Sequence, residues 1–129
     1  MTDFWPEEFG HETVVPPVVM LREQAKALAI KTKGLVIADV ESKSSKNGFR
    51  HEFYLAVPTF EDYRYELFNV FHDVILYPAR VEAYKVGKMT CESPESLERV
   101  LKQILSSETT ISVVRSLMAQ ASLSLQPSE

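Results

Sequence analysis

The sequence predicts a two-layer α+β domain with an N-terminal helix, a four-stranded antiparallel meander and two C-terminal helices packed on one face of the sheet. Apolar residues recur at helical spacing near both ends of the chain, which is typical of amphipathic helices. Ten of the 13 aromatic residues fall in the middle segment, 35–86, where such enrichment favours strands. A sheet with one apolar face has to bury that face under helices, so the two kinds of element form two layers.

The length and composition fit one domain spanning residues 1–129. The chain has 129 residues and no Gly- or Ser-rich linker that would divide it. We expect residues 1–15 to form an extended N-terminal strap and residues 122–129 to form a polar tail. The net charge is −4, which disfavours a nucleic-acid partner because phosphate binding requires clustered cations.

The same composition disfavours several kinds of binding site, and it disfavours a membrane or secreted protein. The single cysteine and four scattered glycines exclude a multi-thiolate zinc site and a phosphate-cradling loop. We therefore expect no metal site and no cofactor. No apolar stretch approaches a membrane span, and acids stand where a secretory signal would carry basic residues. The expectation is a soluble cytoplasmic protein with no membrane partner.

The first helix is expected over residues 18–32. Pro16 and Pro17 precede it, as suits the start of a helix, and Gly34 is a good left-handed stop. Its apolar stripe consists of Val18, Leu21, Ala25, Leu28 and Thr32, at spacings of three and four.

The strands are expected to be joined first by a tight turn at Asn47-Gly48. That turn pairs Val40 with Leu55 and places one apolar face inward. The inward residues are Val36, Ala38, Val40, Phe49, Phe53, Leu55 and Val57. A second turn in 58–62 then pairs Leu55 with Tyr65.

Beyond Phe71 the pairing stays open between two alternatives. The chain either turns at His72-Asp73 or continues through a bulge to a turn at Pro78-Ala79. In both cases Val81 to Val86 is expected to form the last strand.

The two C-terminal helices are expected over 94–106 and from about 109 to 121. Ser93 is the expected N-cap of the first, and Pro94 occupies its first position. Its apolar residues are Leu97, Val100, Leu101, Ile104 and Leu105, which follow the full helical template.

A polar group is expected in the apolar face at His51. In the predicted pairing His51 lies opposite Asn69, with Ser44 nearby. One interpretation is an internal imidazole–amide hydrogen bond, because buried polar groups need partners. The other is a polar pocket for a small ligand, which is the site that a binder or small enzyme would use.

The outer sheet face is the first candidate for binding another protein. The predicted pairing places Arg50, Tyr54, Arg64, Glu66 and Phe68 there. The alternative is a solvated face of cross-strand pairs. Tyr, Phe and Arg are enriched in interface cores, and the third strand is apolar on both sides, which a fully solvated face would not require.

The second candidate is the strap, which carries Trp5 between Phe4 and Phe9. These rings either pack back on the core of the same chain or dock on another subunit. Cys91 lacks a nearby base, and His72-Asp73 is more typical of a polar turn than of a metal site.

These observations favour a small, acidic, non-catalytic interaction module, chaperone-, adaptor- or immunity-like. Its partner would be another protein or a second copy in a homodimer, bound through the outer face or the strap. The chain is similar to secretion chaperones and toxin-neutralising immunity proteins in size, charge and element order. The alternative function is a small-ligand binder or small enzyme at His51/Asn69. Catalytic motifs are absent, so the sequence leans away from an enzyme.

Overall fold

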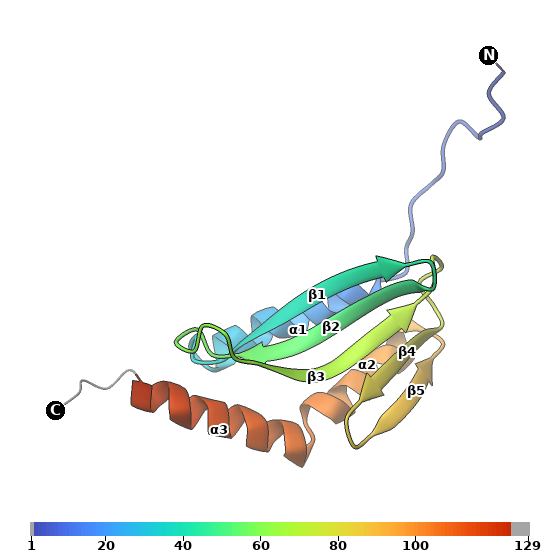
Figure 1. Cartoon of the computed structure of the whole chain (residues 1–129). Helices are drawn as coiled ribbons and strands as arrows, with labels where there is room; N and C mark the ends of the chain where they lie inside the picture. The colour runs from blue at the N-terminus through green and yellow to red at the C-terminus, as the bar shows by residue number, and fades with distance from the viewer. Residues whose placement is uncertain (1, 125–129) are drawn as a thin grey trace.

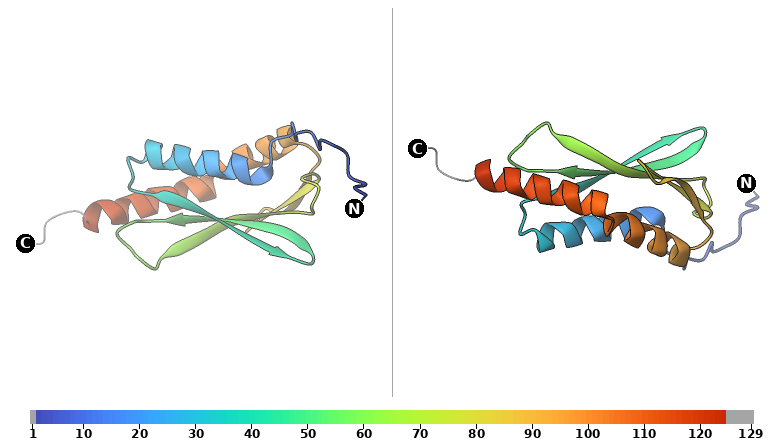
Figure 2. Two further views of the ribbon diagram at one scale, coloured as in Figure 1. Left: turned by 90° about the horizontal axis from the view of Figure 1, so that it is seen from above. Right: turned by 90° about the horizontal axis from the view of Figure 1, so that it is seen from below.

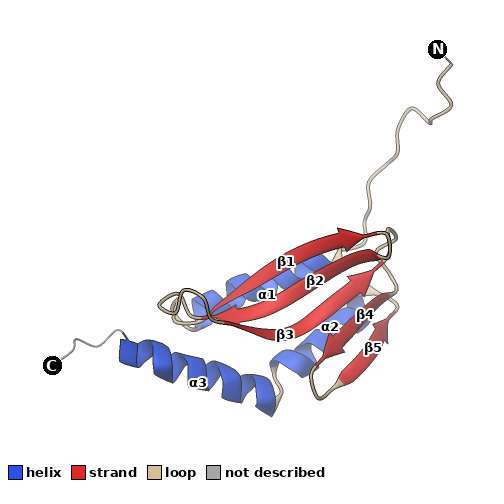
Figure 3. Cartoon of the chain, viewed as in Figure 1, coloured by secondary structure: helices blue, strands red, loops and turns tan. Residues whose placement is uncertain are grey.

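The computed structural model describes residues 2–124 and places three helices on one face of an antiparallel sheet (Figures 1 and 3). The elements in chain order are α1 (Pro17–Lys31), β1 (Ile37–Ser45), β2 (Gly48–Ala56), β3 (Arg64–His72), β4 (Ala79–Ala83), β5 (Gly87–Cys91), α2 (Pro94–Leu105) and α3 (Glu108–Ser124). The sheet order is β1-β2-β3-β4-β5. The predicted α+β class, the meander and the helix positions are therefore confirmed.

The sheet has one strand more than predicted. The segment expected as a last strand, 81–86, contains the end of β4 and a turn into β5. Lys85 and Gly87 both have positive φ, 71° and 92°, so the backbone reverses within that segment. Of the two alternatives after Phe71, the strand ends at His72, and a loop over 73–78 leads to β4.

The helix ends are fixed by local hydrogen bonds. Ser93 caps α2 as predicted, and Ser96 returns the interaction to complete a capping box. After α1, the Thr32 hydroxyl accepts a hydrogen bond from the Val36 backbone at 3.1 Å, which steers the chain into β1. Helix α3 continues to Ser124. The predicted polar tail is therefore helical at its start, and its residues 125–129 lie outside the described part.

The β1–β2 hairpin has the predicted faces but a register shifted by two residues. Ser45 pairs with Gly48, so Lys46 and Asn47 form the turn in place of Asn47-Gly48. Gly48 opens β2 with φ 119°. Val40 consequently meets Phe53 rather than Leu55. A shift of two preserves the alternation of faces, because successive side chains point to opposite sides of a strand.

A bulge in the β2–β3 pair moves the second half of β3 by one residue. Leu55 pairs with Tyr65 as predicted, but the register shifts between Phe53 and Tyr54. Leu67 and Phe68 thereby both enter the core, with 7% and 1% of their surfaces exposed. This explains why β3 is apolar on both sides, and it reverses the predicted faces of every later residue in the strand.

The core lies between the sheet and the helices (Figure 2). Stacked rings of Phe53 and Phe68, with centroids 4.8 Å apart, occupy its sheet side. Leu21 of α1, Leu101 of α2 and Leu117 of α3 bury against it. The opposite face of the sheet carries no helix in the described part of the chain and is called the outer face below.

Candidate functional site

The outer face is organised in rows that run across all five strands. One row, called the basic row, consists of directly paired neighbours from β1 to β5: Lys43, Arg50, Phe71, Arg80 and Thr90. The next row, called the acidic row, lies two residues along each strand: Glu41, Glu52, Asn69, Glu82 and Lys88. Cations and carboxylates therefore lie side by side.

Ion pairs connect the two rows. Glu52 contacts Lys43 at 3.0 Å and Arg50 at 3.3 Å between nitrogen and oxygen. Burial disfavours the charged Glu52 carboxylate, but the Lys43 hydrogen bond and the Arg50 charge outweigh it, so the pKa of Glu52 is lowered. The Glu52 contact in turn raises the pKa of Lys43. Both groups remain charged at neutral pH.

The second carboxylate of the acidic row is shared in the same way. Glu82 contacts Arg80 at 3.3 Å and Lys88 at 3.5 Å. The Arg80 guanidinium also lies 4.7 Å from the centre of the Phe71 ring, which is within the range of a cation–π contact. Phe71 therefore lies between the two arginines of its row, Arg50 and Arg80.

Glu52 and Glu82 are less exposed than the cations that they contact. The Glu52 side chain is 7% exposed, whereas Lys43 and Arg50 are 49% and 43% exposed. Glu82 is 28% exposed, and Arg80 is 49% exposed. At this end of the face the three cations are therefore more accessible to an approaching molecule than these two carboxylates.

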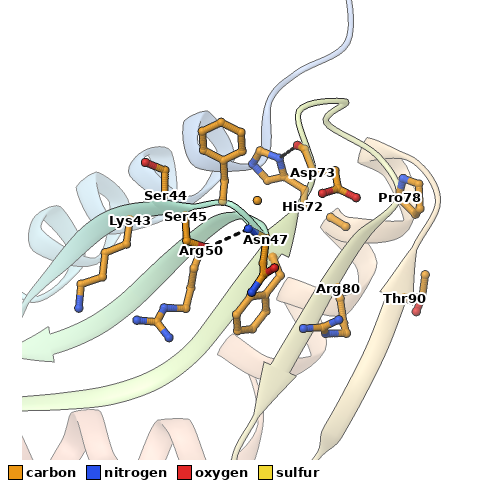
Figure 4. Close-up of a pocket in the computed structure, with 14 residues that line it drawn as sticks. Lys43, Ser44, Ser45, Asn47, Arg50, His72, Asp73, Pro78, Arg80 and Thr90 are labelled. Atoms are coloured by element: carbon orange, nitrogen blue, oxygen red, sulfur yellow. Dashed lines mark hydrogen bonds between the residues drawn. The ribbon is translucent and has the colours of Figure 1, made fainter.

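A hollow of about 760 Å³ lies at this end of the face (Figure 4). The basic row, the tip of the β1–β2 hairpin and the 73–78 loop border it. Its polar lining includes Lys43, Ser45, Asn47, Arg50, Asp73 and Arg80. The volume falls within the range of pockets that enclose ligands, roughly 300–1,000 Å³. Its polar lining includes three cations and a single carboxylate, Asp73.

Four of the five predicted outer-face residues lie where the sequence placed them, and Phe68 does not. Arg64 lies 4.1 Å from the centre of the Tyr54 ring, and Glu66 accepts a hydrogen bond from Asn69 at 2.7 Å. Phe68 points into the core because of the bulge after Glu66. The prediction that Phe68 belongs to a partner surface on the outer face is therefore wrong.

The predicted polar cluster of His51, Asn69 and Ser44 is not assembled either. The bulge pairs His51 with Val70 and turns Asn69 to the outer face. Ser44 pairs with Phe49, two register positions from the His51–Ser42 pair. Sequence reasoning missed His72 as the partner of His51. A bulge of one residue in β3 places His72 on the same face as His51. The sequence of β3 contains no turn residue that would have marked this bulge.

His51 instead belongs to a chain of hydrogen bonds that sets which of its ring nitrogens carries the proton in the neutral form. His72 Nδ1 lies 2.6 Å from the Asp73 carbonyl oxygen, which only accepts, so this nitrogen carries the proton. In the neutral pair, His72 Nε2 then accepts from His51 Nε2 at 2.8 Å. His51 Nδ1 in turn accepts from the Ser42 hydroxyl at 2.7 Å. Every ring nitrogen of the pair has a partner.

This arrangement disfavours a proton on His51 and leaves it closed to ligands. Burial lowers the pKa of His51 to about 4, and the charges of His72 and Arg22 act in the same direction. Only 5% of its surface is exposed. Its geometry is that of an internal polar contact.

The strap extends away from the body of the molecule (Figure 1). Phe4, Trp5 and Phe9 are 92%, 73% and 76% exposed. Trp5 and Phe9 contact each other, with ring centroids 5.8 Å apart. The interpretation in which these rings pack on the core of their own chain is therefore wrong. At the base of the strap, the Tyr77 hydroxyl donates to the Val15 carbonyl at 2.8 Å.

The remaining candidates show no reactive geometry. Cys91 is fully buried, and burial raises the pKa of its thiol. Within residues 2–124, no group of three or more His, Cys, Asp or Glu side chains could hold a metal ion. No helix in the same range is long and apolar enough to cross a bilayer.

Comparisons with protein-family models, with curated proteins and with solved structures found no match.

Proposed function

We propose that the protein is a non-catalytic interaction module that binds a second protein chain through its N-terminal strap, with a second copy of itself as the partner. The observation that carries this proposal is the exposure of Phe4, Trp5 and Phe9 on one short segment. Large aromatic side chains are usually buried or held at interfaces. A segment that presents three of them to solvent is suited to docking on another surface.

The energetics favour an arm that docks on a partner. Three aromatic side chains bury roughly 150–250 Å² each, which at about 25 cal/mol per Å² corresponds to roughly 11–19 kcal/mol. Association and ordering of a flexible segment cost about 4–15 kcal/mol or more. The apolar contacts of the strap can therefore offset the cost of association, and additional polar contacts on the partner would set the affinity.

The outer face by itself is less suited to be the centre of an interface. Interface cores are depleted in charged residues, and both rows of this face are largely charged. Its ion pairs are satisfied within the chain, as the contacts of Glu52 and Glu82 illustrate. This supports the strap as the main docking element.

Light scattering over a dilution series tests the proposal. We expect the full-length chain to be dimeric at high concentration, and the double variant Trp5→Ser, Phe9→Ser to be monomeric. The matched control is Tyr84→Ser, which removes an equally exposed aromatic, 76% accessible, from the β4–β5 turn. A monomer at every concentration, or a dimer that survives the strap substitutions, would refute the proposal.

A further inference from the structure

The strap and the basic row are complementary in charge and in side-chain type. The described strap residues include four acids, Asp3, Glu7, Glu8 and Glu12, and no Lys or Arg. Its aromatic residues stand between these acids. The basic row presents three cations around Phe71. A segment with acidic and aromatic residues thus has, on the same molecule, a surface with basic and aromatic residues.

We propose that the strap of one copy docks in the hollow over the basic row of a second copy. The strap carboxylates pair with Lys43, Arg50 and Arg80, and a strap ring packs on Phe71. The inference rests on the proposed function and specifies the surface that receives the strap. It also gives the cations of the outer face a role, which is to bind the acidic residues of the strap.

The greater exposure of the cations favours an acidic segment as the occupant. Arg50 is 43% exposed and its partner Glu52 is 7% exposed, whereas Arg80 is 49% exposed and its partner Glu82 is 28% exposed. A docking carboxylate therefore reaches the guanidinium and ammonium groups more readily than it reaches these acids. Arginine can bind two carboxylates through different N–H groups of its planar fork.

The position of the strap favours a reciprocal exchange between two copies. The base of the strap is tied to Tyr77, and the next residue, Pro78, borders the hollow. Each copy therefore presents a strap and a receiving surface at the same end. Two copies facing each other across a two-fold axis can exchange straps, and such an interface closes on itself. The strap also points away from its own body (Figure 1).

Trp5 provides a direct readout, because it is the only tryptophan in the chain. We expect its fluorescence emission to shift to shorter wavelength as the concentration of the full-length protein rises, in step with dimer formation. Raising the salt concentration should weaken the dimer, since the contacts are between exposed charges.

Charge reversal identifies the receiving surface. We expect Arg50→Glu with Arg80→Glu to raise the dimer dissociation constant at least tenfold. Arg64→Glu is the matched control, because Arg64 lies on the same face with the same 43% side-chain exposure as Arg50. It should change the constant less than twofold. Adding Glu7→Arg and Glu8→Arg to the double variant should restore most of the lost affinity.

The single variant Arg80→Glu tests whether the double variant loses the dimer only because it misfolds. Each substitution removes one of two cations from a carboxylate, but Glu52 is 7% exposed whereas Glu82 is 28% exposed and keeps Lys88. The loss of a cation costs less at the more exposed carboxylate. Arg80→Glu alone should therefore retain its urea unfolding curve and still weaken the dimer severalfold.

The outcomes separate the two proposals. Loss of the dimer in the strap variant, with an unchanged dimer in both row variants, would overturn this inference and leave the proposed function standing. A short-wavelength Trp5 emission that is independent of concentration in a monomer would show docking within one chain and would also overturn it. A dimer that survives the strap substitutions would remove the proposed function itself.

Discussion

Acidification should destabilise this protein over the range in which His51 would ordinarily gain a proton. Burial, followed by the charges of His72 and Arg22, lowers the pKa of His51 from 6.5 to about 4. Between these values the unfolded chain binds a proton that the folded chain excludes. Stability is therefore unaffected by this group well above pH 6.5, and it falls as the pH drops toward 4.

The size of the effect follows from the two pKa values. A tenfold difference in proton affinity is worth about 1.4 kcal/mol. With values of 6.5 and about 4, linkage gives a loss of about 2 kcal/mol at pH 5 and about 3 kcal/mol at pH 4. That is a large part of the roughly 5–15 kcal/mol by which ordinary domains are stable.

The variant His51→Gln isolates this contribution, because glutamine retains hydrogen-bonding groups and does not titrate. At neutral pH we expect it to be less stable than the native chain by about 1–2 kcal/mol, through a weakened contact with His72 or Ser42. The difference should shrink or reverse by pH 5. Titratable groups that do not contact residue 51 are the same in both chains, so their effects cancel in the comparison.

Urea unfolding at 25 °C, followed by circular dichroism at pH 7.5, 6 and 5, measures the difference. The free energy of unfolding of the native chain should fall by about 2 kcal/mol more than that of the variant between pH 7.5 and 5. Parallel curves would refute the reasoning about His51. A direct NMR titration of the folded His51 ring should give a midpoint near 4.

Three further predictions test the fold. Phe68→Asp should prevent stable folding, at a cost above about 4 kcal/mol, because it buries a charge where 1% of the ring is exposed. The control Arg64→Glu should fold normally. If circular dichroism shows a folded Phe68→Asp chain, the bulge that turns Phe68 inward is contradicted. Gly48→Ala should destabilise by roughly 2–3 kcal/mol in urea, since its φ is 119° and a Cβ would lie 2.7 Å from the His72 carbonyl oxygen. Gly34→Ala, with φ 80° and open space, should cost only about 1 kcal/mol, and equal losses would argue against the close approach. Cys91, buried and with a raised pKa, should react with a thiol reagent only at the rate of unfolding, and fast labelling in native buffer would count against that burial.

The helices could be predicted closely because their signals are local. The cap at Ser93, the proline after it and the spacing of Leu97 and Leu101 lie within a few residues of each other. These features depend on backbone hydrogen bonding and on one helical face, and neither requires knowledge of the rest of the chain. The structure keeps each of them.

The sequence predicted four strands rather than five because β4 and β5 are short. Gly87 and the exposed side chain of Tyr84 mark a turn, but the apolar residues Val81, Ala83 and Val86 in a segment of six residues suggested a single strand. The strands on either side, β4 and β5, are five residues each. Short strands carry little alternation, so a turn between them is easily read as the continuation of one strand.

The candidate site was predictable only in part. Arg50 and Tyr54 lie on β2, and their faces follow from alternation with Phe53 and Leu55, because the extra residue of the bulge is in β3. Arg80 and Phe71 of the basic row were not predicted together, because their meeting depends on the pairing of β3 with β4. The strap aromatics were identified from the sequence, but their exposure is a property of the folded chain.

What the sequence by itself determined is the set of helices, the meander and the two faces of the first hairpin, since helical spacing and strand alternation are local properties. Even a register error of two residues left those faces intact. The tertiary structure decided which residues of β3 meet which partners. Leu67 and Phe68 can both reach the core only if one residue is left unpaired. That packing requirement turns Asn69 outward and brings His72 to His51, and no local pattern in the strand encodes it.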